Sequence, residues 1–120
     1  MAVFLGQLVN GVIVSKFFLD KEKHTIGRHP KNDLIVDDSS VSSHHAVIEA
    51  RPDDYLDGHF NFFLKDLGST NGTFVNDLEI KAERRLANYD MVKFASHLFR
   101  FIDEEESQAG SGTTMECLDD

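Results

Sequence analysis

The sequence has 120 residues, 41% of them hydrophobic, which is enough for one ordinary domain whose core needs neither a metal nor a disulfide. The net charge of −9 argues against general nucleic-acid binding, and the single cysteine, Cys117, excludes an internal disulfide and fits a reducing compartment. The sequence also contains neither a signal peptide nor an apolar run of roughly 18–20 residues, so we expect a cytoplasmic protein that does not use a membrane.

The acidic residues are concentrated near the C-terminus. All 12 Lys and Arg lie before residue 103, and the first 102 residues have a net charge of only −2. This near-neutral body can still bind one phosphate through a few well-placed donors. From Asp103 onward the composition is acidic, small and polar. It predicts a disordered acidic tail over 103–120 that follows a folded domain over 1–102.

Short runs of β-branched and aromatic residues, separated by turn residues, recur in the first half of the chain. The first two candidate strands, 2–9 and 12–19, flank Asn10-Gly11. This pair is typical of a two-residue hairpin turn, because both central positions of that turn need positive φ. The other candidate strands of this half are 24–28, 33–36 and 44–50.

The second half repeats the pattern, with Asn76-Asp77 as another turn signal. The segment 82–88 has some helical propensity but is too short for a stable helix, so we expect a loop there. About ten to eleven short strands without a sustained helical period predict an all-β fold, a β-sandwich of two antiparallel sheets. The candidate strands of this half are 60–66, 73–75, 78–80, 91–95 and 97–102.

Three polar clusters interrupt the strands, at residues 25–28, 41–48 and 65–76. They contain Gly-Arg, then Ser-x-x-His, then Ser-Thr-Asn-Gly-Thr. In this order and at this spacing they resemble the signature of the forkhead-associated (FHA) domain over about residues 1–102. The resemblance implies a SMAD-like sandwich that binds phosphothreonine peptides with loops at one end.

Arg28 and Ser42 are the main candidate phosphate ligands. A phosphate monoester is a dianion with three acceptor oxygens, and the planar guanidinium of Arg28 has donors spaced for two of them. A surface ion pair with a carboxylate is the alternative for Arg28. The resemblance implies that Ser42 donates to the phosphate, although a serine there can also stabilise its own turn.

The resemblance implies three further peptide contacts. Thr70 contacts the phosphate or lines the pocket for the threonine methyl, and Asn71 bonds the peptide backbone, for which an amide suits because it donates and accepts. Ser43 stands where family members often have Asn or Arg, so its contribution is either a hydroxyl or only a backbone N–H. His29, Lys31 and Asn32 follow Arg28 in what we expect to be a solvated loop.

Gly27, His45 and Gly72 are expected to support the site. Gly72 supplies positive φ to its turn, and the resemblance implies that His45 bonds across the loops. His44 and His45 fall in the predicted strand 44–50, where their side chains would point to opposite faces and could not share a metal. We expect no metal and no cofactor.

The sequence contains no catalytic motif. Ser42, His45 and Asp66 could be imagined as a hydrolase triad, but there is no Gly-x-Ser-x-Gly elbow and no Walker-type phosphate loop. We therefore expect a signalling module that binds phosphothreonine proteins, not an enzyme, and a Ser/Thr kinase is implied. A phosphate-independent docking or dimerisation domain of the same fold is the alternative.

Thr113 and Thr114 lie in the acidic tail, where they are candidate kinase substrates. Once phosphorylated, either could bind the domain of the same chain or another chain, and tethering would raise the effective concentration. A tail that only increases solubility, or that begins a linker, is the simpler alternative.

Overall fold

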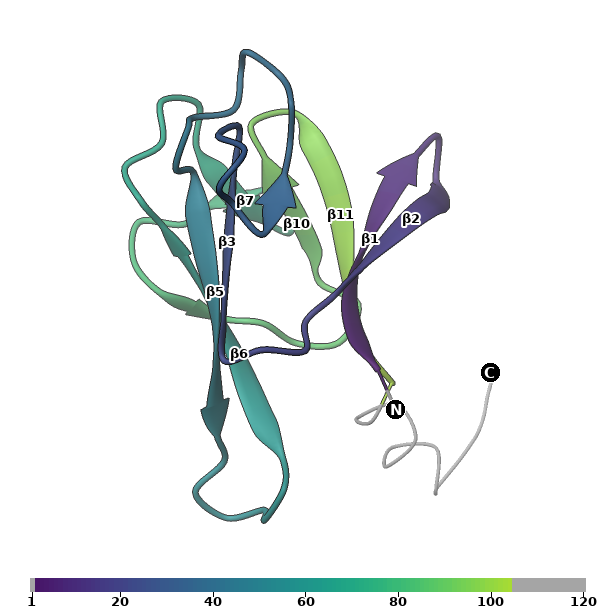
Figure 1. Cartoon of the computed structure of the whole chain (residues 1–120). Helices are drawn as coiled ribbons and strands as arrows, with labels where there is room; N and C mark the ends of the chain where they lie inside the picture. Colours follow the sequence, from purple (N-terminus) through teal and green to yellow (C-terminus); the bar gives the residue numbers. More distant parts are fainter. Residues whose placement is uncertain (1, 105–120) are drawn as a thin grey trace.

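The computed structural model describes residues 2–104, which form 11 β-strands arranged in two layers (Figure 1). The predicted all-β sandwich is confirmed. The strands are β1 (Val3–Val9), β2 (Val12–Phe18), β3 (Lys23–Gly27), β4 (Leu34–Ile35), β5 (Ala46–Pro52), β6 (Phe60–Asp66), β7 (Thr73–Val75), β8 (Leu78–Glu79), β9 (Arg84–Arg85), β10 (Met91–Phe94) and β11 (His97–Asp103).

One sheet has six strands in the order β2-β1-β11-β10-β7-β8, and the other has five in the order β4-β3-β5-β6-β9. Every strand pair is antiparallel except β3 and β4, which run parallel over Ile26–Leu34 and Gly27–Ile35. The first strand of the chain pairs with the last, Val3 opposite Asp103. That pairing brings the two ends of the described chain together at one end of the sandwich (Figure 1).

The core lies between the sheets and is built from alternating inward-facing residues. In β11, Phe99 and Phe101 are buried while their neighbours are only half-buried. Each fully buried side chain of this size contributes about 1.5–3 kcal/mol relative to exposure. The largest fully buried apolar side chains are Phe94, Phe101, Leu5, Ile26, Ile48 and Leu64.

Both predicted turns are confirmed. Asn10 and Gly11 have φ of 53° and 79°, and Asn76 and Asp77 have φ of 51° and 69°. These are the left-handed values that a two-residue hairpin turn requires, and Asn, Asp and Gly adopt them at low cost.

Two predicted elements were wrong. The strand expected at 44–50 begins only at Ala46 and runs to Pro52, so His44 lies in a turn and His45 lies between that turn and β5. The backbone N–H of Ser42 donates to the ring of His45, which closes the loop just before the strand. Residues 82–88 are also not entirely loop, since β9 pairs there with the outer edge of β6.

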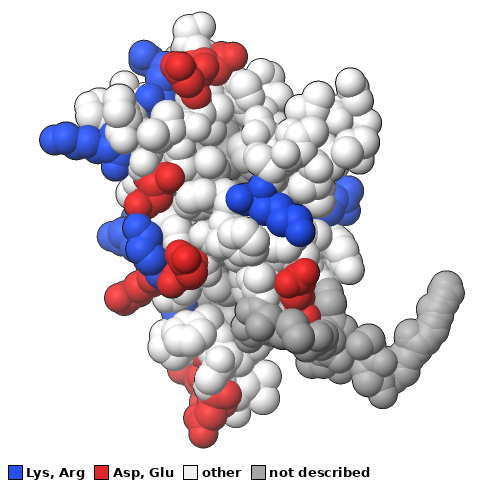
Figure 2. Space-filling view, turned by 45° about the vertical axis from the view of Figure 1, so that its right-hand side comes forward, with Lys and Arg blue, Asp and Glu red and all other residues white. Residues whose placement is uncertain are grey.

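The loops divide between the two ends of the sandwich. Three loops, at 28–33, 36–45 and 67–72, gather at the upper end in Figure 1. The β2–β3 turn, the β5–β6 hairpin and the ends of the described chain lie at the lower end. The face in Figure 2 mixes basic and acidic residues and shows no single basic patch. Asp103, which was expected in the tail, is instead the last residue of β11 and is buried. The rest of the expected tail from residue 105 on, with Thr113, Thr114 and Cys117, lies outside the described residues.

Candidate functional site

The β4–β5 loop (36–45) lies between the two other loops of the upper end and is bonded to both. On one side, the backbone N–H groups of Arg28 and His29 donate to the carbonyls of Ser42 and Ser43, at 3.0 and 3.2 Å. On the other side, the backbone N–H of Thr70 donates to the Ser42 hydroxyl at 3.0 Å. Residues from all three sequence clusters therefore meet at one surface.

Gly27 permits the close approach of the first two loops. A Cβ at this position would lie 2.3 Å from the carbonyl oxygen of Ser43 and 2.7 Å from Nδ2 of Asn32. The backbone φ of Gly27 is not left-handed, so the requirement is one of space and not of conformation. Without the glycine, Arg28 could not pair with the β4–β5 loop at this distance.

Arg28 follows the end of β3 and is exposed. Its Nε donates to the carbonyl of Val41 at 3.0 Å, which fixes the plane of the guanidinium. Among residues 2–104, no carboxylate pairs with Arg28, so the surface ion pair considered as an alternative does not form there. The two terminal nitrogens remain able to donate to a ligand, in the fork geometry that suits two phosphate oxygens.

Ser42 and Ser43 face different partners. Because the Ser42 hydroxyl accepts the N–H of Thr70, its own proton remains available to donate outward. The Ser43 carbonyl accepts from both His29 N and Asn32 Nδ2. Within the described chain the Ser43 hydroxyl has no hydrogen-bond partner, so it too can donate to a ligand.

His45 connects the second and third loops from within the protein. Its side chain is fully buried, Nδ1 accepts the backbone N–H of Ser42 at 3.1 Å, and Nε2 lies 2.8 Å from the carbonyl oxygen of Gly72. A backbone N–H can only donate, so Nδ1 must be the acceptor and Nε2 carries the proton. The ring packs edge-to-face with Phe94, with the two ring centroids 5.8 Å apart. A neutral imidazole thus satisfies both loops.

Asp66 organises the third loop from the end of β6. Its carboxylate accepts from the backbone N–H groups of Gly68 and Ser69 and from the hydroxyls of Ser69 and Thr73. Burial acts to raise the pKa of Asp66, but these hydrogen bonds outweigh it and hold the pKa below its usual value. The carboxylate is therefore ionised at neutral pH and holds the loop through charge-assisted bonds.

Thr70 and Asn71 are exposed at the tip of the third loop, and the buried Gly72 follows them. Nδ2 of Asn71 donates to the carbonyl of Ser40 at 2.7 Å, which ties this turn to the β4–β5 loop. The amide oxygen of Asn71 has no hydrogen-bond partner among residues 2–104. Gly72 has a φ of +89°, as its turn was expected to need.

Asn32 is a site residue that the sequence analysis misplaced. Expected in a solvated loop, it is only 7% exposed, and its Nδ2 donates to the carbonyls of His29 and Ser43, at 2.9 and 2.7 Å. It therefore joins the first two loops as His45 joins the second and third. Nothing in the composition of the loop distinguishes Asn32 from the exposed Lys31 beside it.

Asp38 was also not singled out by the sequence. It accepts from the hydroxyl and the backbone N–H of Ser40, at 2.6 and 2.8 Å. These bonds, with a smaller effect from His97, lower the pKa of Asp38 to about 2. Ser40 in turn presents its carbonyl to Asn71.

The described residues offer no metal site. Among residues 2–104, no three His, Cys, Asp or Glu side chains lie close enough to bind a metal ion together. The same part of the chain contains no helix that is long and apolar enough to span a membrane. The donors that the three loops present include the guanidinium of Arg28 and the hydroxyls of Ser42 and Ser43.

The family profile described as "FHA domain" matches residues 24–95, which include all three polar clusters. The chain belongs to the FHA domain family. An oxoglutarate dehydrogenase inhibitor of Corynebacterium jeikeium is 36% identical over 88 residues, covering 73% of this chain and 56% of that protein. The glycogen accumulation regulator GarA of Mycobacterium tuberculosis is 32% identical over 100 residues, covering 83% of this chain and 57% of GarA. This FHA chain thus spans little more than half the length of these curated relatives.

Solved FHA structures superpose on the chain. The FHA domain of the CT664 protein from Chlamydia trachomatis has a TM-score of 0.74 at 28% identity, covering 86% of this chain and 98% of that domain. M. tuberculosis EmbR, solved in complex with a low-affinity phosphopeptide, has a TM-score of 0.71 at 30% identity, covering 84% of this chain and 24% of EmbR. The yeast Dun1 FHA domain, solved with a doubly phosphorylated (pT) peptide from Rad53, has a TM-score of 0.70 at 28% identity, covering 84% of this chain and 73% of that one.

Proposed function

We propose that this FHA domain is a non-catalytic module that binds phosphothreonine-containing proteins through the three loops at the upper end of the sandwich. The observation that carries the proposal is the state of Arg28. Its guanidinium is fixed through Nε to the carbonyl of Val41, has no carboxylate partner among residues 2–104, and belongs to a residue whose backbone N–H donates to the carbonyl of Ser42. FHA domains solved with phosphopeptides support the same ligand class.

Each site residue has a distinct role in this proposal. Arg28 and Ser42 bind the phosphate, and Ser43 adds its hydroxyl or backbone N–H. Thr70 lines the pocket for the threonine methyl. Asn71 bonds the peptide backbone with its unoccupied amide oxygen, while its nitrogen stays bonded to Ser40. Gly27, His45 and Gly72 do not touch the ligand but keep the loops at the required distances.

The partners follow from this chemistry. A Ser/Thr kinase must supply the phosphothreonine, and the module needs no cofactor, nucleic acid or membrane. We place the protein in the cytoplasm, where such kinases act on soluble partners. The folded domain includes Asp103, the last residue of β11, one residue beyond the predicted boundary at 102. The acidic tail predicted after the domain remains a proposal.

Phosphorylated Thr113 or Thr114 is a candidate ligand for this same site, in the same chain or in a second copy. Native mass spectrometry of the chain before and after phosphorylation of the tail tests this self-association. A change in oligomeric state, or a loss of affinity for added peptide, supports it. Unchanged mass distribution and unchanged affinity would exclude it.

The main test compares three degenerate peptide pools by fluorescence anisotropy: phosphothreonine, phosphoserine and unphosphorylated threonine. We expect binding only to phosphorylated pools. The phosphothreonine pool should be favoured roughly fourfold, because burying one methyl group contributes about 0.8 kcal/mol. Equal binding of the unphosphorylated pool would instead support the phosphate-independent docking domain.

A further inference from the structure

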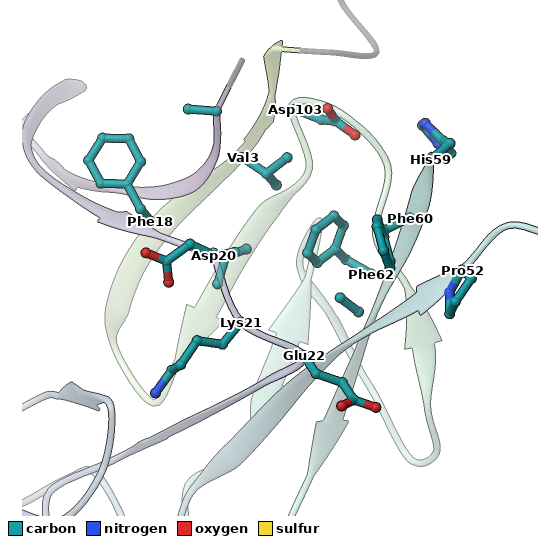
Figure 3. A pocket seen from close by; sticks show the side chains of 13 residues that line it. Val3, Phe18, Asp20, Lys21, Glu22, Pro52, His59, Phe60, Phe62 and Asp103 are labelled. Carbon is teal, nitrogen blue, oxygen red and sulfur yellow. The ribbon is translucent and has the colours of Figure 1, made fainter. Parts of the chain in front are cut away.

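A second surface lies at the lower end of the sandwich, opposite the loops. It is a groove of about 640 Å³ between the ends of strands from the two sheets, next to the ends of the described chain (Figure 3). A groove of this size accommodates more than one bulky side chain. Its apolar lining includes Val3, Phe18, Leu19, Pro52, Phe60 and Phe62.

The groove has a buried floor and exposed walls. Leu19 and Phe62 are each only 6% exposed and belong to the core. Phe18 and Phe60 lie toward opposite sides of the opening in Figure 3, and they are 48% and 46% exposed. Two half-exposed phenylalanines over an apolar floor form the kind of pocket in which an interface buries an anchor side chain.

Acidic side chains dominate the charge around the groove. Asp20 and Glu22 line it and are exposed, whereas Asp103 is buried in its wall, and Lys21 is the only Lys or Arg among its described lining residues. Lys21 is engaged elsewhere, because its ammonium lies 2.6 Å from the carboxylate of Asp33. In Figure 3 its side chain extends away from Phe60 and Phe62. A ligand in the groove therefore meets carboxylates at the rim and aromatic rings below.

The β5–β6 hairpin extends this surface. Tyr55 and Leu56 at its tip are 92% and 58% exposed. The tip is nevertheless ordered, because the carboxylate of Asp53 accepts the backbone N–H groups of both residues and the side-chain amide of Asn61. These bonds lower the pKa of Asp53, so the tip also has a lasting negative charge. The lower end of Figure 2 shows acidic residues at this hairpin.

We propose that this groove docks a basic segment of a partner protein, with a bulky apolar residue in the pocket and Lys or Arg on either side. We choose a basic partner segment because its positive charge complements the carboxylates around the groove. The chain's own C-terminal 18 residues contain seven acidic residues and no Lys or Arg, and a second copy has the same net charge of −9. Both would be repelled by the carboxylates at the rim. The proposal does not depend on phosphopeptide binding, since the two surfaces lie at opposite ends.

The test is an NMR titration of the full chain with three pools of nine-residue peptides. One pool has a central Leu or Phe flanked by Lys and Arg, the second replaces the basic residues by Asp and Glu, and the third replaces the central residue by Ser. We expect only the first pool to shift the amide signals of Phe18, Leu19 and Phe60. The signals of Arg28 and Ser42 should stay in place.

Two variants separate the contributions. Phe60→Ser removes a wall of the pocket and should weaken binding of the first pool at least tenfold, while Glu22→Lys should abolish its advantage over the acidic pool. Glu22 is exposed, and only its backbone carbonyl is used in the fold, where it accepts from Ala50. Glu22→Lys should therefore fold even if Phe60→Ser does not. Glu79→Lys, on β8 and outside the groove, is the matched control and should change nothing.

Four results would overturn the proposal. The groove signals could remain unmoved by all three pools. They could respond equally to the acidic pool, which would remove the role of charge. They could shift when residues 105–120 are deleted, which would assign the groove to the chain's own tail. They could shift with protein concentration alone, which would assign it to a second copy.

Discussion

The two ends of this sandwich are built from the same strands but have surfaces of different chemistry: one is polar and the other has an apolar groove. At the loop end, polar side chains form hydrogen bonds with backbone atoms of the loops. Examples are His45, Asn32, Asp66 and Asn71. At the groove end, Phe18 and Phe60 are half-exposed, and the exposed carboxylates of Asp20 and Glu22 line the same groove. The strands fix the position of the loops at each end, and the side chains there determine what that end can bind.

The comparison also resolves the apparent conflict between an acidic protein and an anionic ligand. The net charge of −9 is a property of the whole chain, whereas a phosphate at the loop end meets Arg28 and a group of N–H and O–H donors. Local donors at short range outweigh distant carboxylates, because solvent and salt screen charges beyond about 10 Å.

Arg28→Ala should cause the largest loss of phosphopeptide affinity at the loop end. It should lower phosphothreonine-peptide affinity about 100-fold, since a charge-assisted bidentate contact contributes about 3 kcal/mol. Calorimetric titration measures this. Arg28→Lys keeps the charge but loses the fork, so it should recover only part of the affinity. Full affinity in Arg28→Ala would mean that the phosphate is bound elsewhere.

Gly27→Ala tests the geometry that supports Arg28. Its Cβ would lie 2.3 Å from a backbone carbonyl, so the loops must move apart, at a cost of about 2–3 kcal/mol of unfolding free energy. Urea unfolding measures the loss. Gly58→Ala is the control, because that glycine has a φ of +77° but nothing near its Cβ position. It should cost only about 1 kcal/mol. Equal losses in the two variants would contradict the steric argument.

Ser42→Ala removes one phosphate donor and should weaken peptide binding about tenfold. It also removes the acceptor for Thr70 N–H, so the variant's melting temperature must be measured alongside its affinity. Ser39→Ala, exposed in the same loop, is the matched control and should bind as the wild type does. If the two variants bind equally well, Ser42 is not a phosphate ligand.

Lowering the pH should weaken peptide binding at the loop end, because the phosphate of the ligand takes up a proton. Between pH 7.5 and 5 the phosphate gains a proton with a pKa of about 6, so affinity should fall by up to about tenfold. Asp66 and Asp38 have folded-state pKa values below their usual ones, so the stability they contribute is present above about pH 4 and is lost only as the pH falls toward their folded pKa values. The loops should therefore persist over this range. Isothermal titrations at several pH values check this, and a flat profile would mean that the phosphate is not the main contact.

Elements whose conformation depends on one or two local residues were predicted correctly from the sequence. Asn10-Gly11 and Asn76-Asp77 reach the expected φ values because few other residue pairs adopt them cheaply. Most strand positions followed from short runs of β-branched and aromatic residues between turn signals. His44 and His45 were placed wrongly in a strand. The His45 ring bonds to Ser42 and to Gly72, 27 positions away, and a local sequence pattern does not show such contacts.

The site was only partly predictable for the same reason. Arg28, Ser42 and Asn71 were singled out because their clusters resemble the FHA signature. Asn32 and Asp38 were not, since each is defined by which backbone atoms the fold brings to it. The groove was not predicted at all. Its lining comes from five separate stretches of chain, and no one of them has an unusual composition.

The most direct test of the account is an NMR titration of the full chain with a phosphothreonine peptide pool, followed at both ends of the sandwich. The account predicts shifts in the amide signals of Arg28, Ser42, Ser43, Thr70 and Asn71, with Phe18 and Phe60 unmoved. Shifts confined to the groove, or equal shifts with the unphosphorylated pool, would contradict the assignment of the loop end as the phosphothreonine site.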